Sequence, residues 1–195
     1  MEFLDKELHK SPLFGLDGSD AIKSLQQQAL EEFNRSGLPN KSWEDWKYSD
    51  FSLLNKMSFT FGLRKDISTL PNTFPNINNT NQIVIYNGYY HEDLSSFSNK
   101  VSVETLKESY KTNPELIRNI LAPNSNPFHN INSAMINSGL MITINDNEII
   151  DDPLHIINYT SDLDAPIMNH PLFIINVGKG SEAAIIEHYY GSTNT

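Results

Sequence analysis

Residues 83–91 read Ile-Val-Ile-Tyr-Asn-Gly-Tyr-Tyr-His and carry the clearest structural signal in the sequence. β-Branched and aromatic residues, which favour strands, lie on both sides of the Asn87-Gly88 pair. Asn and Gly tolerate the positive φ angles that the two central residues of a type I′ turn require. The stretch therefore predicts a β-hairpin over residues 83–92.

Short apolar runs, typical of strands, follow residue 139. No helix-length segment separates them, which excludes βαβ crossovers. Consecutive apolar residues, as in Phe173-Ile174-Ile175, predict burial on both faces of a sheet. Turn-forming Asn, Asp, Pro and Gly lie between the runs, so the pattern suits either a β-sandwich or a parallel β-solenoid. The runs are Leu140–Ile144, Ile149–Ile150, Leu154–Tyr159, Leu172–Val177 and Ala183–His188.

The other segments favour helices. Apolar residues spaced by three and four predict a helix over residues 20–35, which Gly37 and Pro39 end. Residues 42–48 predict a short helix, and residues 103–110 and 114–121 a helical pair whose second member begins at Pro114. Residues 128–136 predict one more helix. The face of the first is formed by Ile22, Leu25, Ala29 and Phe33.

Composition narrows the classes of function. Of 195 residues, 24 are acidic and 14 basic, giving a formal charge of −10. Such a charge disfavours nucleic acid and anionic lipid surfaces as partners. Residues 1–7 are charged and resemble no signal peptide, and no apolar run reaches the roughly 20 residues of a membrane span. We therefore expect a cytoplasmic protein.

We expect no catalytic, cofactor-binding or metal-binding residues in this chain. It contains no cysteine, which excludes disulfides, thiolate ligands and a cysteine nucleophile. No nucleophile elbow marks a serine, and Gly178-Lys179-Gly180 lacks the spacing of a phosphate loop, so it predicts a tight corner.

Two groups of residues are candidate binding sites. His155 and His188 would lie on neighbouring strands of a solenoid, with Glu187 and Asp152 close by, in a group suited to Fe or Zn. However, adjacent strand residues face opposite ways, so His188 and Glu187 cannot bind one ion. The favoured interpretation is that these are ordinary histidines, exposed on the surface or stacked in a ladder between strands.

The aromatic group Trp43, Trp46 and Tyr48 offers a stacking surface for a base or a sugar. The net charge argues against nucleic acid, and we favour packing of the short helix against the face of helix 20–35.

Short motifs along nearly the whole chain resemble, in order, those of SufD-type proteins in the SufB/SufD family. Taken singly, only Trp46-Lys47-Tyr48 is moderately specific. The matching elements are Ala29 and Phe33, Gly37 and Pro39, Glu44 with Trp46-Lys47-Tyr48, the hairpin region from Ile83 to Ser95, Phe128, Asn132, Ala134 and Gly139, Asp152-Pro153-Leu154-His155-Ile156, His170-Pro171, and Glu187-His188-Tyr189. The sequence departs from the family pattern at Asn169-His170-Pro171, where the family commonly has an arginine.

The resemblance implies an α+β fold. A small N-terminal helical region with the β-hairpin would be followed by the first rungs of a right-handed parallel β-helix, a single-stranded β-solenoid. The corresponding domains are residues 1–138, mainly helical, and residues 139–195, a truncated start of the β-helix. The chain would match the N-terminal half of such a protein and lack the C-terminal region that binds SufC.

The implied function is that of a SufD-like, non-catalytic scaffold in the SufB–SufC–SufD complex, which assembles iron–sulfur clusters. Its partners would be SufB-like and SufC-like subunits, with no cofactor of its own. Self-association is also expected, because the solenoid would end in an open strand edge that the polar residues 191–195 are too few to cover. Two alternatives remain open: a β-solenoid enzyme of the polysaccharide lyase or acyltransferase type, and a carbohydrate-binding β module.

Overall fold

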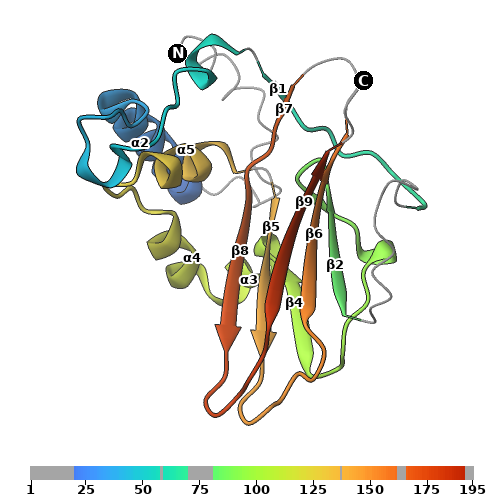
Figure 1. Cartoon of the computed structure of the whole chain (residues 1–195). Helices are drawn as coiled ribbons and strands as arrows, with labels where there is room; N and C mark the ends of the chain where they lie inside the picture. Colours follow the sequence, from blue (N-terminus) through green and yellow to red (C-terminus); the bar gives the residue numbers. More distant parts are fainter. Residues whose placement is uncertain (1–19, 58, 70–80, 137, 162–165, 192–195) are drawn as a thin grey trace. The chain divides into compact units, whose positions relative to one another are not determined.

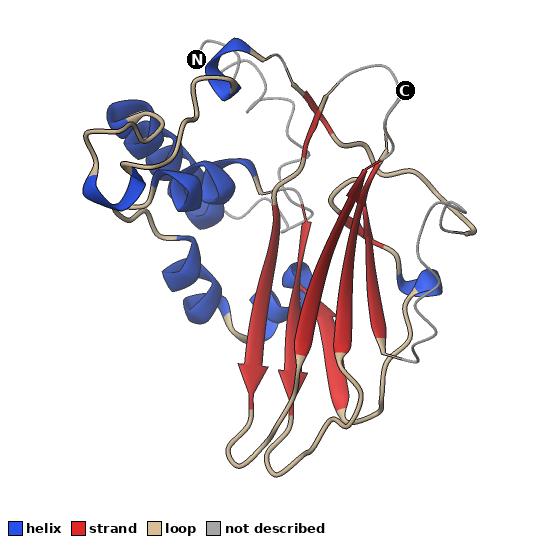
Figure 2. Ribbon diagram, viewed as in Figure 1, coloured by secondary structure: helices blue, strands red, loops and turns tan. Residues whose placement is uncertain are grey.

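A computed structural model describes residues 20–57, 59–69, 81–136, 138–161 and 166–191. The chain forms two compact units, and each unit combines two separate stretches of sequence. Met1–Phe59 and Lys107–Asn137 form the first unit, which carries most of the α-helical residues (Figure 1). Thr60–Leu106 and Ser138–Thr195 form the second, which carries the strands (Figure 2). The domain division at residue 138 stays a prediction.

Helix α2 (Asp20–Ser36) confirms the helix predicted over residues 20–35. Gly37 follows the last residue of the helix. Its N–H donates to the Phe33 carbonyl (2.7 Å), and its φ of +68° is the left-handed conformation in which helices commonly end. The buried face also contains Gln26, whose Nε2 donates to the carbonyl of Ala134 on α5 (Pro127–Met135) at 3.0 Å. The apolar residues of that face are Ile22, Ala29, Leu30 and Phe33.

The predicted helical pair is half correct. Helix α4 (Pro114–Leu121) begins at Pro114 as expected, but α3 is limited to Leu106–Thr112. The residues before it form strand β4 (Val101–Thr105), which pairs with β5 (Ser138–Ile144). The prediction failed because the partner that makes residues 101–105 a strand lies far along the sequence.

The described strands of the second unit form three sheets. The first has the order β3-β2-β6-β9, the second β4-β5-β8, and the third is the short pair β1-β7. Their remaining members are β1 (Thr60–Phe61), β2 (Gln82–Tyr86), β3 (Tyr89–Tyr90), β6 (Leu154–Thr160), β7 (Ile167–Met168), β8 (Pro171–Val177) and β9 (Ile185–Gly191). From β5 onward the four long strands alternate between the two larger sheets.

The predicted hairpin is confirmed. Strands β2 and β3 are antiparallel, and Tyr86 pairs with Tyr89 across a two-residue turn. Asn87 and Gly88 have φ angles of +49° and +85°, the pair of positive angles that a type I′ turn needs.

The prediction of a right-handed parallel β-helix is wrong. The two larger sheets are mixed, since β2–β3 and β4–β5 pair antiparallel whereas β2–β6, β6–β9 and β5–β8 pair parallel. None of the sheets formed by the described strands is closed or arranged as a solenoid. The fold is α+β with mixed sheets. Short apolar runs with tight corners specify strands, but they leave partner and direction to tertiary packing.

An apolar core lies between the two larger sheets. It is built from alternate residues of β2, β4, β5 and β6, which point to one side of each strand. Strand β6 is buried on both faces, whereas on β8 Phe173 and Ile174 are only partly buried and Ile175 is exposed, contrary to expectation. The core residues are Ile83, Ile85, Val101, Leu140, Ile142, Ile144, Ile150, Leu154 and Ile156.

Candidate functional site

The open edges of β8 and β9 are the most distinctive surface of the second unit. Each strand has one neighbour among the described strands, β5 for β8 and β6 for β9. An unpaired strand edge presents backbone N–H and C=O groups that another strand can bind.

Apolar side chains continue from the core to the edge of β8. Ile142 and Ile144 on β5 are at most 1% exposed, whereas their register partners Ile175 and Val177 are 38% and 47% exposed. These side chains belong to the face of the sheet that forms the core, so the edge of β8 is an incompletely covered part of that core.

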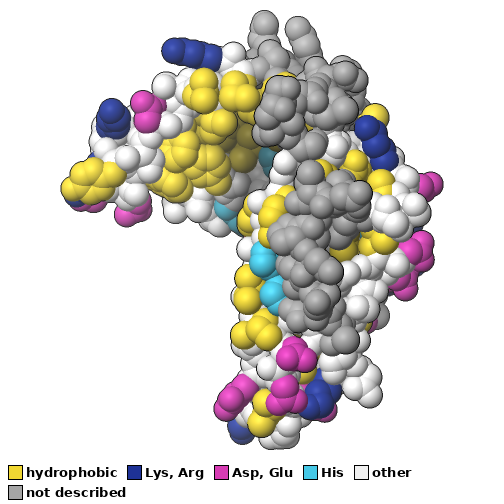
Figure 3. Space-filling model, turned by 45° about the vertical axis from the view of Figure 1, so that its right-hand side comes forward, with side chains coloured by type: hydrophobic (Ala, Val, Ile, Leu, Met, Phe, Trp, Pro, Cys, Tyr) yellow, Lys and Arg dark blue, Asp and Glu magenta, His cyan; other side chains and the backbone are white. Residues whose placement is uncertain are grey.

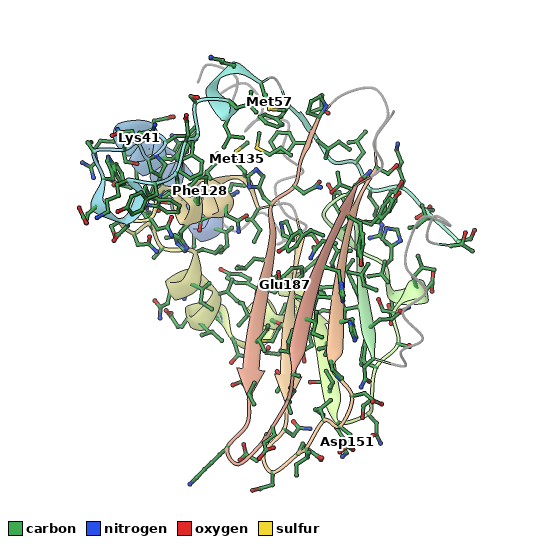
Figure 4. All side chains as sticks on the ribbon, viewed as in Figure 1. Lys41, Met57, Phe128, Met135, Asp151 and Glu187 are labelled. Carbon is green, nitrogen blue, oxygen red and sulfur yellow. The ribbon has the colours of Figure 1, made fainter. Side chains whose placement is uncertain are left out.

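The edge of β9 is more polar. Tyr189 is 73% exposed, and its hydroxyl donates to Glu187 (2.5 Å), which projects from β9 in Figure 4. Partial burial, together with the hydrogen bond to Glu187, raises the pKa of Tyr189 to about 12. The phenol therefore stays protonated at physiological pH, and its hydroxyl can donate a hydrogen bond to the Glu187 carboxylate.

His155 and His188 meet on the opposite face of the same sheet. Nδ1 of His155 lies 2.7 Å from Nε2 of His188, and the ring planes differ by 18°. The register pairs His155 with Ile186 and Ile157 with His188, so the two histidines are diagonal neighbours on β6 and β9. The predicted adjacency of these two residues on neighbouring strands is therefore found in the structure. Figure 3 shows histidine side chains beside hydrophobic ones on the surface it presents.

The carboxylates expected near the histidines do not join them. Glu187 precedes His188 on β9 and hence faces the other side of the sheet, where it accepts from Tyr189. Asp152 precedes β6, and its backbone carbonyl accepts from the side chain of Asn81 at 3.1 Å. Among the described residues, no group of three or more His, Asp or Glu is placed to hold a metal ion.

Sequence reasoning missed the contact between Tyr190 and His188. The Tyr190 hydroxyl lies 3.3 Å from Nδ1 of His188, and the rings stack at 5.9 Å with 13° between their planes. The signal was the i, i+2 spacing, which puts both side chains on one face of a strand.

Two asparagines with buried polar atoms were also missed. Asn158, on β6, and Asn169 line a cavity of about 240 Å³ in the second unit. Nδ2 of Asn158 and Oδ1 of Asn169 are buried and have no hydrogen-bond partner. The space is large enough for ordered water to satisfy both groups.

The aromatic group around Trp46 is a packing cluster. Trp46 contacts Phe51 and Phe128, and the three ring centroids are 5.0–5.4 Å apart. Phe128 comes from α5 (Figure 4). The structure does not place Tyr48 in this cluster: Tyr48 is 92% exposed, with the Lys47 ammonium 5.2 Å from its ring centroid.

The predicted corner at residues 178–180 is confirmed. The backbone N–H of Lys179 donates to the Asp146 carboxylate at 2.7 Å, and Gly180 has a φ of +74°. A Cβ on Gly178 would lie 2.5 Å from the backbone of residues 145–146, so glycine is required for one corner to pack on the other.

The antiparallel pairing that a carbohydrate-binding sandwich needs is not found among the long strands after residue 138, because β5–β8 and β6–β9 are parallel. Within the part of the chain that the structure describes, no helix is long and apolar enough to cross a membrane.

Residues 10–156 match the family model described as the SufBD protein N-terminal region. No curated protein matches the chain.

Proposed function

The chain belongs to the SufB/SufD family, and on that premise we propose that it acts as a SufD-like, non-catalytic scaffold subunit in iron–sulfur cluster assembly. The family match over residues 10–156 is the observation that carries the proposal. We propose SufB-like and SufC-like subunits as its partners and the cytoplasm as its location.

The open edges of β8 and β9 support a role in binding other proteins. A partner strand can extend a sheet by main-chain hydrogen bonds, while its side chains select the register. The exposed apolar side chains of Ile175 and Val177 would be covered by such a strand. Partly exposed core residues at a strand edge suit a stably bound protein partner better than a transiently bound substrate.

Co-purification tests the proposal. The tagged chain is expressed together with SufB and SufC, and we expect it to retain SufB. The double variant Ile175→Lys/Val177→Lys should retain much less SufB, because two charges would be buried without partners. The matched control is Leu63→Lys, which adds a charge at another exposed apolar residue of the same unit (66% exposed).

Recovery of neither SufB nor SufC with the unmodified chain would contradict the scaffold proposal. Equal recovery of SufB by the double variant and by the control would retain a scaffold role but would exclude the β8 edge as the binding surface. Circular dichroism of each variant, compared with the unmodified chain, separates loss of binding from loss of folding.

We further propose that these edges mediate self-association when no partner is present. We propose neither nucleic acid nor a membrane as a partner, because the formal charge of −10 opposes contact with phosphate-rich surfaces.

A further inference from the structure

The two histidines on β6 and β9 are held head to head. The ring centroids lie 5.0 Å apart and the facing nitrogens 2.7 Å apart. The distance between the centroids exceeds the distance between the nitrogens by about the sum of the two ring radii. Both nitrogens therefore lie near the line that joins the ring centres. In this arrangement one nitrogen carries a proton and the other presents its lone pair.

Tyr190 fixes the orientation of one ring. His188 has a hydrogen-bonding partner at each nitrogen, the Tyr190 hydroxyl at Nδ1 (3.3 Å) and His155 at Nε2. When Nδ1–H of His188 donates to the hydroxyl, Nε2 presents its lone pair toward His155. Metal-binding histidines are commonly oriented in this way, through a hydrogen bond from the ring nitrogen that does not bind the ion.

The pair lies among uncharged side chains. The neighbouring side chains of β2, β6 and β9 on this face are uncharged: Gln82, Val84, Tyr86, Ile157, Tyr159, Ile186 and Tyr190. Neutral imidazole is the form that binds metal ions.

We propose that Nδ1 of His155 and Nε2 of His188 together bind a divalent transition-metal ion of the class that imidazole prefers, copper(II) or zinc(II), with water completing the coordination. The proton between the rings moves to Nε2 of His155, which leaves both facing nitrogens with free lone pairs and the charge of the rings unchanged. The nitrogens must then separate beyond 2.7 Å, because each bond to zinc is about 2.0–2.1 Å long.

The position of β9 allows this separation. It is the last strand of its sheet among the described residues, so His188 can move without displacing a further strand. Two protein ligands give an exchangeable site, in contrast to the four that close a structural zinc site. The site does not depend on the proposed scaffold function.

Copper(II) titration of the full chain without a polyhistidine tag tests the proposal. We expect one bound equivalent whose electron paramagnetic resonance spectrum shows coupling to two nitrogens. His188→Gln should remove the two-nitrogen signal, and zinc(II) should compete for the same site. The matched control is His129→Gln, because His129 lies on α5 and its Nε2 already contacts the Ala122 carbonyl at 2.9 Å; it should leave binding unchanged.

Tyr190→Phe tests the orienting role. We expect affinity to fall by about tenfold, as for other residues that orient a ligand, while the two-nitrogen signal persists. An unchanged affinity would show that Tyr190 does not position His188.

The ring nitrogens of the unmodified chain provide a readout that needs no variant. Zinc(II) should shift the ¹⁵N resonances of His155 Nδ1 and His188 Nε2 together. No shift, or copper binding that survives His188→Gln, would overturn the proposal.

Discussion

At the scale of single residues, buried His170 makes the stability of the chain depend on pH. Burial lowers its pKa to about 4, below the ordinary value of 6.5 for histidine. The unfolded chain therefore binds more protons between these values, so stability is complete above pH 6.5 and falls as the pH drops toward 4. The difference corresponds to about 3 kcal/mol of unfolding free energy.

Urea unfolding of the unmodified chain and of His170→Gln, measured from pH 8 to pH 4, checks this expectation. The two should show parallel stabilities above pH 7, and the variant should lose less stability below pH 6.5. Identical slopes in the acid range would show that His170 is not the group responsible.

The histidine pair shows how far residue-level reasoning reaches from the sequence. The regular alternation of strands predicted that His188 and Glu187 face opposite sides, and it allowed His155 and His188 to be neighbours. The sequence could not predict their 2.7 Å contact, because the register between β6 and β9 decides it. Gln26 was missed for the same reason, since its partner, the Ala134 carbonyl, lies 108 positions away.

At the scale of elements, Asn87 does more in the hairpin than provide a positive φ. Its side chain is fully buried, donates to the Ser161 carbonyl (3.0 Å) and accepts from the Ser161 N–H (2.8 Å). Asn87→Gly keeps the turn geometry but removes both of these hydrogen bonds. We expect a loss of about 1–3 kcal/mol of unfolding free energy.

Asn147→Gly is the matched control for that substitution. Asn147 also has a positive φ (+60°), but its side chain is exposed at a corner. Chemical denaturation should show a change within about 0.5 kcal/mol. Equal losses for both variants would mean that the turn conformation, and not the contact with Ser161, determines the effect.

Local elements were predictable and pairings were not. The Asn87-Gly88 turn depends on two adjacent residues, and α2 and α4 on spacings within one segment, so the sequence predicted all three. Strand β4 was predicted as part of a helix because its partner is distant in the sequence, and the apolar runs after residue 139 left the direction of pairing open for the same reason. The parallel β-helix was implied by the family resemblance, and the mixed sheets contradict it. The candidate site at β8 and β9 was anticipated only as an open strand edge.

The exposed edge of β8 should make the isolated chain self-associate. Sedimentation velocity over a range of concentrations should show species larger than the monomer, and Ile175→Lys/Val177→Lys should return the chain to monomer because charges at a strand edge oppose pairing. A single monomeric species of the unmodified chain at all concentrations would contradict this prediction.

At the scale of the whole molecule, the two compact units are interleaved in sequence. Residues 139–195 contain β6 and most of β5, whose partners β2 and β4 lie before residue 107. We therefore expect the fragment 139–195 to be unfolded alone by circular dichroism. The full chain serves as the folded reference, and cooperative thermal unfolding of the isolated fragment would refute the expectation.

The same interleaving has a consequence for synthesis on the ribosome. Strands β2 and β4 emerge early, but the segments that complete their sheets follow only after the whole helical stretch from 107 to 137 has been translated. At a translation rate of roughly 5–20 residues per second, several seconds pass before the partners of these apolar strands are synthesised. During that interval the nascent polypeptide is exposed to premature aggregation, so chaperones that bind extended apolar segments should associate with it before release.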